Sequence, residues 1–277
     1  MAGGFSIFPA MIRPETLSRT KVADLRKLLQ KKYRTERGRF LVEGIRSVEE
    51  VLESDWPVEV VVMTEYLAAD HPPLVQRIRS RRVPLYSVSR QDLERISDTT
   101  HSQGILAVVE QKSLPTNFLE GLVPGSMVVV ADEVSEPGNL GTVIRTCDWF
   151  GASAVVVSEG SAEVFNPKVV RSTMGSLFHV PVVWDAHTQN TLDMLRRRKY
   201  RVYATSSAKG TDIQQTAWSD RSVLVFGNEA HGLSSATSHY ADEFVRIPRF
   251  GRAESLNVGI ACGIALASWR LTCKLHS

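Results

Sequence analysis

Several polar side chains follow buried strands at the points where those strands end: Asn139, Arg145, Glu229 and Asn257. Ligands of open α/β sheets bind outside the carboxyl ends of the strands, so these positions favour a site. An amide, a guanidinium and a carboxylate can together orient a substrate and stabilise developing charge. Each residue alone has a simpler interpretation, because Asn and acids cap helices and Arg pairs with acids. Their repetition at three strand ends favours chemistry.

The turn after the first of these strands excludes several common enzyme classes. Residues 132–141, Asp-Glu-Val-Ser-Glu-Pro-Gly-Asn-Leu-Gly, contain neither the GxGxxG nor the GxxxxGK[ST] pattern. A dinucleotide-binding Rossmann site and a P-loop are therefore disfavoured, as is the common methyltransferase fold with its Gly-rich first turn. The chain also lacks a Gly-x-Ser-x-Gly elbow, which argues against an α/β-hydrolase.

The cysteines and the apolar segments indicate a soluble protein without a metal. The three cysteines, Cys147, Cys262 and Cys273, form no CxxC pair, so we expect no zinc site and no disulfide framework. The apolar run 256–269 is too short to span a bilayer, and the N-terminus does not resemble a signal peptide. We expect a cytoplasmic protein.

Basic residues are concentrated near the N-terminus although the net charge is only +3. Nine of them, against Asp24 and Glu36, lie between residues 19 and 39: Arg19, Lys21, Arg26, Lys27, Lys31, Lys32, Arg34, Arg37 and Arg39. Such a run is either a solvated helix face or a contact for an anionic partner such as RNA or DNA.

Hydrophobic periodicity predicts the elements that hold these residues. Helical spacing begins at Ser18 and continues to residue 32, and strands alternate with helices as far as residue 109, which indicates a small α/β sandwich. After a Pro- and Gly-containing linker, buried strands alternate with helices, as in a parallel sheet covered on both faces. The strands are predicted at 127–131, 154–157, 180–183, 201–204 and 223–226, and the helices at 139–150, 167–177 and 188–198. We expect an N-terminal domain at 1–112, a linker at 113–125 and a C-terminal domain at 126–277.

Three segments carry a resemblance to a known family. Asn-Leu-Gly-Thr-Val-Ile-Arg (139–145), Phe-Gly-Asn-Glu-Ala-His-Gly-Leu-Ser (226–234) and Ile-Pro-Arg-Phe-Gly-Arg-Ala-Glu-Ser-Leu-Asn-Val (247–258) resemble the three motifs of the SpoU/TrmH family. Residues 171–182 are similar to the segment between those motifs. Arg249 and Gly259 depart from the family pattern, and neither is one of the matched catalytic positions. Residues 40–44, Phe-Leu-Val-Glu-Gly, resemble more loosely the start of the family's N-terminal module.

The resemblance implies an RNA ribose 2′-O-methyltransferase of the SPOUT class that uses S-adenosylmethionine. The fold it implies is α/β: a C-terminal trefoil-knotted domain with a parallel sheet, preceded by a small α/β/α ribosomal-protein-like RNA-binding domain. A knot is an exception to the rule against knotted chains. The resemblance also implies a homodimer with its active site at the subunit interface. Because a sulfonium already activates the methyl group, the implied reaction needs no metal, and the short apolar run leaves no expectation of a membrane partner.

The family's site residues can be placed on matching positions of this chain. The catalytic positions are Asn139, Arg145, Glu229, Ser255 and Asn257. The cofactor would contact backbone groups of Thr205, Gly227, Ile247 and Leu256. In the family Arg145 is proposed as a base, but a guanidinium rarely releases its proton. An electrostatic clamp for a phosphate or the developing alkoxide is our preferred role for Arg145.

The implied substrate makes the basic stretch 19–32, with Arg34, Arg37 and Arg39, a predicted RNA contact. The residues singled out there are Arg19, Lys21, Lys31, Lys32 and Arg39. The N-terminal module favours ribosomal over transfer RNA. Alternatives are a transfer RNA ribose methyltransferase, a base methyltransferase of the same class, a resistance enzyme acting on ribosomal RNA and a catalytically silent RNA-binding assembly factor. His231 and His179 are interpreted as non-catalytic.

Overall fold

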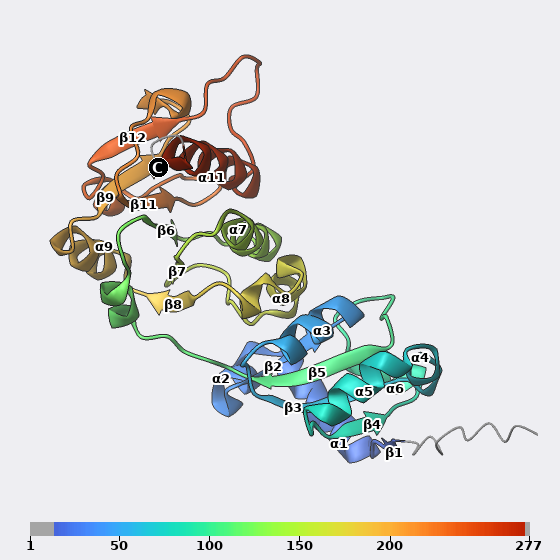
Figure 1. Cartoon of the computed structure of the whole chain (residues 1–277). Coiled ribbons are helices and arrows are strands. Elements are labelled where there is room, and N and C mark those ends of the chain that lie inside the picture. The colour runs from blue at the N-terminus through green and yellow to red at the C-terminus, as the bar shows by residue number, and fades with distance from the viewer. Residues whose placement is uncertain (1–13, 275–277) are drawn as a thin grey trace, which may run out of the picture.

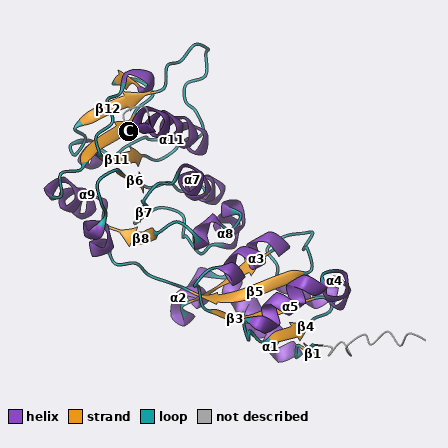
Figure 2. Cartoon of the chain, in the orientation of Figure 1, coloured by secondary structure: helices purple, strands orange, loops and turns teal. Residues whose placement is uncertain are grey.

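The computed structural model describes residues 14–274, which form two domains, each built on its own β-sheet (Figures 1 and 2). The five-stranded N-terminal sheet has the order β1-β4-β3-β5-β2. Its strands β1, β4 and β3 are parallel, and β5 runs antiparallel to both β3 and β2. These strands are β1 (Glu15–Thr16), β2 (Arg39–Glu43), β3 (Val58–Met63), β4 (Leu85–Ser87) and β5 (Ile105–Glu110).

Helices cover the N-terminal sheet, which confirms the predicted small α/β sandwich (Figure 2). The helices are α1 (Arg19–Arg26), α2 (Lys31–Arg37), α3 (Ile45–Glu53), α4 (Glu65–Asp70), α5 (Pro72–Ser80) and α6 (Arg90–Ile96). Ser18 and Ser89 cap α1 and α6 as their sequence positions indicate, each accepting from a backbone N–H three residues on.

The C-terminal sheet has seven strands in the order β10-β12-β9-β11-β6-β7-β8, and every pairing in it is parallel. Its strands are β6 (Ser126–Ala131), β7 (Ala154–Ser158), β8 (Val182–Ala186), β9 (Arg201–Thr205), β10 (Thr211–Asp212), β11 (Arg221–Phe226) and β12 (Glu243–Arg246). The predicted parallel sheet is therefore confirmed. The sheet order does not test the knot, which stays a prediction.

Helices lie on both faces of this sheet because its strands are apolar on both sides. Met127 and Val129 of β6 join the core under α7 (Pro137–Phe150), α8 (Pro167–Thr173) and α11 (Val258–Lys274). Val128 and Val130 face the opposite core, under α9 (Thr188–Arg197). The short α10 (Ser235–Ser238) contacts α9. No helix within residues 14–274 is long and apolar enough to cross a membrane.

Two predicted elements are wrong in the C-terminal domain. The helix predicted at 167–177 ends at Thr173, because Met174 and Gly175 have φ values of 52° and 99°. The strand predicted at 180–183 begins two residues later, at Val182, since Val180 packs below α8 before the strand starts.

The N-terminal helix predicted through residue 32 is also wrong, and Arg34 is the physical reason. The chain leaves helical geometry at Gln30, with φ −99° and ψ 133°, and starts again as α2. Arg34 Nη1 donates to the carbonyls of Leu28 and Leu29 at 2.8 Å each, which satisfies groups that the interrupted helix leaves open. Arg34 is only 2% exposed, so its predicted contact with RNA is wrong.

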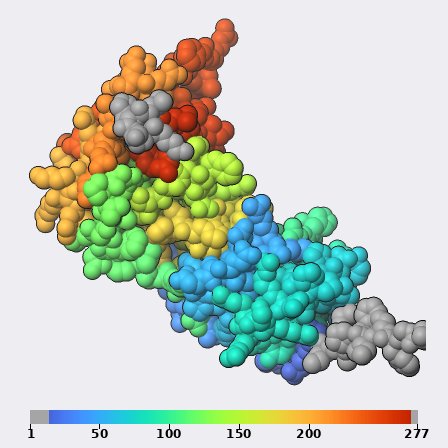
Figure 3. Space-filling model, viewed as in Figure 1, coloured from blue at the N-terminus to red at the C-terminus, as the bar shows by residue number. Residues whose placement is uncertain are grey.

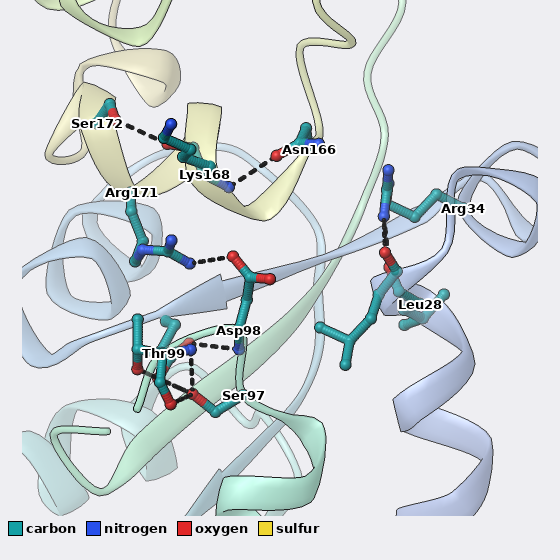
Figure 4. A network of polar contacts seen from close by, with 11 residues as sticks. Leu28, Arg34, Ser97, Asp98, Thr99, Asn166, Lys168, Arg171 and Ser172 are labelled. Atoms are coloured by element: carbon teal, nitrogen blue, oxygen red, sulfur yellow. Dashed lines mark hydrogen bonds and ion pairs between the residues drawn. The ribbon is translucent and has the colours of Figure 1, made fainter. Parts of the chain in front are cut away.

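Charged pairs and aromatic rings join the two domains. Arg34 donates through Nε and Nη2 to both carboxylate oxygens of Glu163 in the C-terminal domain. Arg171 Nη1 of α8 donates to Asp98 Oδ2 at 2.9 Å (Figure 4). Phe40 packs against Phe165 in a tilted arrangement, with ring centroids 4.7 Å apart. One apolar core thus crosses the domain boundary, and the two domains are packed together rather than only tethered.

Replacing Arg34 with Ala should lower the free energy of unfolding by about 3 kcal/mol, because a nearly buried carboxylate would lose its partner. Urea unfolding measures this change. The matched control is Arg37→Ala, whose partner Asp24 is half exposed, and we expect a loss below about 1 kcal/mol there. Equal losses in the two variants would contradict the role of Arg34 in stabilising the contact between the two domains.

Candidate active site

The site forms around the first turn of α7, immediately after β6. Glu136 is the N-cap of this helix, and its Oε2 accepts from the backbone N–H of Asn139 at 2.7 Å. Pro137 occupies the first helical position, where its missing N–H and fixed φ suit the helix. The turn therefore holds the Asn139 amide at the carboxyl edge of the sheet. Glu136 was not among the predicted site residues, although an acid directly before Pro-Gly is a capping signal.

Glu229 lies across from this turn and accepts several hydrogen bonds. Its Oε2 accepts from Ser135 N and Ser135 Oγ, both at 3.3 Å, and its Oε1 accepts from Asn139 Nδ2 at 3.0 Å. A further bond, from Glu136 N, is 3.4 Å long. Glu229 therefore connects the end of β11 to the start of α7. The alternative that Glu229 only starts a helix is wrong, because the next helix begins at Ser235.

Asn257 completes the group from the start of α11. Its Nδ2 donates to Asn139 Oδ1 at 2.7 Å, while its own Oδ1 accepts from Gly259 N at 2.9 Å. Asn257 thus caps α11 and holds Asn139 at the same time. The resulting chain Asn257–Asn139–Glu229, which we call the polar node, joins all three motifs and fixes the orientation of the Asn139 amide.

Both carboxylates of this region remain ionised at neutral pH. Partial burial acts to raise the pKa of Glu229, but hydrogen bonds from Asn139 and from the backbone N–H groups of residues 229, 135 and 136 outweigh it and lower that pKa. The Lys168 ammonium, with backbone N–H groups of α7, lowers the pKa of Glu136 against its desolvation. Glu229 is therefore an acceptor that orients the amide, not a proton donor.

Close helix packing holds the third motif against the first. A Cβ added to Gly259 would lie 2.6 Å from Thr142 Cγ2, so α11 can approach α7 at this depth only with glycine there. A Cβ added to Gly141, on the other side of α7, would likewise lie too close to Ser172 of α8. The departure of Gly259 from the family pattern thus has a packing reason.

The turn that carries Glu229 is locked by a residue that the sequence interpretation missed. Asn228 Nδ2 donates to Glu133 O at 2.9 Å, and its Oδ1 accepts from Ala230 N at 2.9 Å. Asn228 and Gly232 also form an antiparallel bridge. The Gly-Asn-Glu order could have indicated this turn, since Asn side chains often bond the backbone two residues on.

Two predicted catalytic residues make no hydrogen bond to the polar node in the described part of the chain. Arg145 is exposed on α7 and makes no hydrogen bond or ion pair with any residue between 14 and 274, so the acid partner considered for it is absent from that range. Ser255 is exposed and equally without a partner in that range. Within residues 14–274 the single chain therefore does not bond Arg145 or Ser255 to the other three residues.

The predicted cofactor positions lie at the ends of three adjacent strands. Thr205 ends β9, Gly227 follows β11 and Ile247 follows β12, and β9 pairs with both neighbours. Leu256 precedes α11. The backbone groups of Gly227, Ile247 and Leu256 have no hydrogen-bond partner in the described part of the chain, so they can accept a ligand's polar edge. Gly227 has a second reason to be glycine, because a Cβ there would meet Gly232 C at 2.4 Å.

The predicted RNA-contact residues lie on α1, α2 and β2, and Figure 1 places α1 on the side of the N-terminal domain away from the catalytic domain. Arg19 and Lys31 are exposed, and no residue of the described chain pairs with them. Lys21 contacts Tyr86, Lys32 lies 3.9 Å from Glu36, and Arg39 pairs with Glu59 at 2.8 Å.

Neither candidate histidine has a side-chain hydrogen bond to the node among the described residues. His231 is exposed on the 228–232 turn. His179 Nε2 lies 2.9 Å from Glu50 Oε2 across the domain boundary, which supports its structural interpretation. Among the described residues, no group of three or more His, Cys, Asp or Glu side chains could hold a metal ion.

Comparisons with known proteins identify the chain's relatives. A family model described as the SpoU rRNA Methylase family matches residues 126–267, and an MRM3-like substrate binding domain model matches residues 19–107. The chain is 35% identical to the 23S rRNA (guanosine(2553)-2′-O)-methyltransferase RlmP of Bacillus subtilis strain 168, over 90% of this chain and 96% of that protein.

Solved structures agree with this result. An AdoMet-bound rRNA methyltransferase from Sinorhizobium meliloti is 31% identical, covers 94% of this chain and 97% of its own, and gives a TM-score of 0.83. The SpoU methyltransferase AviRb from Streptomyces viridochromogenes, in complex with AdoMet, gives 0.82 at 26% identity over 93% of this chain and 99% of its own.

The family model, the relatives and the AdoMet-bound structures together show an RNA 2′-O-ribose methyltransferase that uses S-adenosylmethionine. The chain belongs to the SpoU rRNA methylase family. The predicted family, reaction class and cofactor are confirmed, and the silent assembly factor on the same fold is disfavoured by the intact polar node.

An Asn139→Asp variant should lose activity in a pH-dependent way. Its carboxylate would stand about 3 Å from Glu229, and two such like charges raise the pKa of one of them. We expect kcat/KM to fall at least about ten-fold at alkaline pH, where both carboxylates are charged. It should recover partly at lower pH, where one proton is shared between the carboxylate at position 139 and Glu229.

The control for this variant is Asn139→Ala, whose loss should not shrink with falling pH. The measurement is methyl transfer to RNA across the pH range of the folded protein. A loss in Asn139→Asp that does not change with pH would show that Glu229 and residue 139 are not in contact during the reaction.

Proposed function

We propose that this protein methylates a ribose 2′-hydroxyl of the large-subunit ribosomal RNA. The observation that supports this most strongly is the polar node, in which one asparagine amide ties together all three motifs at the carboxyl edge of a parallel sheet. The names of the relatives support the choice of RNA, since RlmP is a methyltransferase of 23S rRNA. The substrate-binding module at residues 19–107 supports a structured RNA over a small one.

In this proposal the chain contributes alignment and electrostatics rather than a covalent intermediate. Bound S-adenosylmethionine supplies an activated methyl group on a sulfonium. Strand-end backbone groups of Thr205, Gly227, Ile247 and Leu256 would hold it. Asn139, fixed by Glu229 and Asn257, would orient the ribose, and such alignment can account for much of the barrier.

Arg145 acts, in our proposal, on the site of a second copy of the chain. It carries no partner within the described residues and lies on an exposed face of α7 with Trp149, which is 83% exposed. Ile260 and Ile264 of the adjacent helix α11 are 56% and 38% exposed, which provides an apolar surface suited to a homodimer. A guanidinium delivered across that interface would stabilise the developing alkoxide or a phosphate, while Ser255 shapes the loop before α11.

The remaining assignments are proposals of the same kind. We place an RNA-binding domain at 1–112, a linker at 113–125 and the catalytic domain, with its trefoil knot, at 126–277. Arg19, Lys21, Lys31, Lys32 and Arg39 are proposed to contact RNA phosphates. Ribosomal RNA as substrate supports a cytoplasmic location.

The test of substrate compares unmodified transcripts of large-subunit ribosomal RNA, small-subunit ribosomal RNA and transfer RNA from the encoding organism. With isotope-labelled S-adenosylmethionine, we expect label only in the large-subunit transcript. Mass spectrometry of the released nucleosides should then place the methyl on ribose. Labelling of transfer RNA alone, or of a base, would contradict the proposal.

The shared site can be tested by mixing two inactive variants, Arg145→Ala and Asn139→Ala. Random pairing makes about half of the dimers mixed. If Arg145 serves the partner's site, each mixed dimer has one intact site and one damaged site, so activity should return to about a quarter of wild type. The control pairs Asn139→Ala with Asn257→Ala, which damage the same node and should give no recovery. Absence of recovery in the first mixture would place Arg145 in its own subunit's site.

A further inference from the structure

The loop between β12 and α11 projects from the body of the molecule (Figures 1 and 3). Its two ends are held at the site, because Ile247 follows the strand beside β9 and Asn257 donates to Asn139. Between them, residues 249–256 are all exposed and make no hydrogen bond or ion pair with other described residues. The loop therefore leaves its side chains free to contact a ligand that approaches the site from solvent.

Phe250 is the most conspicuous of these side chains, with 96% of its surface exposed. A single exposed apolar residue needs no special explanation on its own. This one differs in its neighbours, since Arg249 and Arg252 flank it and neither pairs with an acid in residues 14–274, Glu254 included. An aromatic ring between free guanidinium groups suits a flat, anionic ligand such as a nucleotide.

Phe250 lies close along the chain to the proposed cofactor site. It lies three positions after Ile247, so its Cα lies at most about 11 Å from the strand end proposed to hold the methyl donor. The polar node consists of amides and a carboxylate. These groups can orient a ribose, but they include no aromatic ring on which the attached base can stack. In-line transfer requires the whole nucleotide to be held, not only its hydroxyl.

We infer that Phe250 is a stacking platform for an unstacked base of the RNA substrate, at or beside the methylated nucleotide, with Arg249 and Arg252 holding the adjoining phosphates. This rests on the proposed function, because it takes RNA as the ligand. Specific RNA recognition uses splayed bases stacked on aromatic side chains, and each such stack is usually sequence-tolerant. Phe250 therefore positions the nucleotide in the active site and takes no part in the methyl transfer itself.

The experiment compares Phe250→Ala, Phe250→Leu and Phe250→Tyr in the full-length protein, with unmodified large-subunit ribosomal RNA transcript as substrate. Stacking is worth about ten-fold or more per base, so kcat/KM for RNA should fall by at least that factor in the Ala variant. Leu keeps apolar bulk without a ring and should fall almost as far. Tyr keeps the ring and should remain near wild type.

Two further readouts separate stacking from other roles of the loop. Isothermal titration should give unchanged S-adenosylmethionine affinity in all three variants, and sedimentation should give an unchanged oligomeric state. RNA binding to the Phe250→Ala variant should keep the wild-type salt dependence, whereas Arg249→Gln with Arg252→Gln should reduce its slope, since only charged contacts release counterions.

The inference is overturned by an Ala variant with wild-type kcat/KM, by a Leu variant that retains full activity, or by loss of cofactor affinity or of oligomeric state. The first two outcomes exclude stacking, and the others make Phe250 a cofactor or subunit contact. The wild-type protein in the same assay distinguishes the two levels of failure. If wild type does not methylate the transcript, the proposed function fails; if it does and Phe250→Ala matches it, only the stacking role fails.

Discussion

The site depends on the orientation of one amide, that of Asn139. A primary amide has a donor end and an acceptor end, and here each end is used: Nδ2 donates to Glu229 and Oδ1 accepts from Asn257. Because Glu229 follows β11 and Asn257 starts α11, three segments that are distant in sequence meet at this one group. Ionised Glu229 is the stronger acceptor for this amide, and the same hydrogen bonds favour the ionised form by lowering its pKa.

The rest of the fold serves to bring those segments together. Parallel pairing places the ends of β9, β11 and β12 side by side, and Gly259 lets α11 approach α7 closely enough for Asn257 to reach Asn139. At the other end of the protein, Arg34 ends one helical segment and binds Glu163 of the catalytic domain, so the substrate-binding module is held in a fixed place. Arg145 remains outside this arrangement, which is why we place it in a second copy's site.

Much of this was accessible from the sequence, because the signals were local. Buried β-branched runs predicted the parallel strands, and the three motifs predicted the reaction and the residues of the polar node. The breaks at Gln30 and Met174 were not predicted, since the first depends on Arg34 reaching across the domains and the second on a left-handed residue that is not glycine. A basic run likewise cannot reveal that Arg34 is buried while Lys31 is exposed, because burial is decided by tertiary packing. Glu136 and Asn228 had local signals in the sequence, one for a helix cap and one for a turn. They were missed because those signals were not connected to the site.

A double-mutant cycle between Asn139 and Asn257 tests most directly that the three motifs act as one unit. Each residue is replaced by Ala alone and then both together, and kcat/KM for RNA methylation is measured in all four proteins. We expect the double variant to lose little more than the more damaged single variant, because Asn139→Ala already removes the amide that Asn257 holds in place. Losses that multiply, as for two independent residues, would contradict the account.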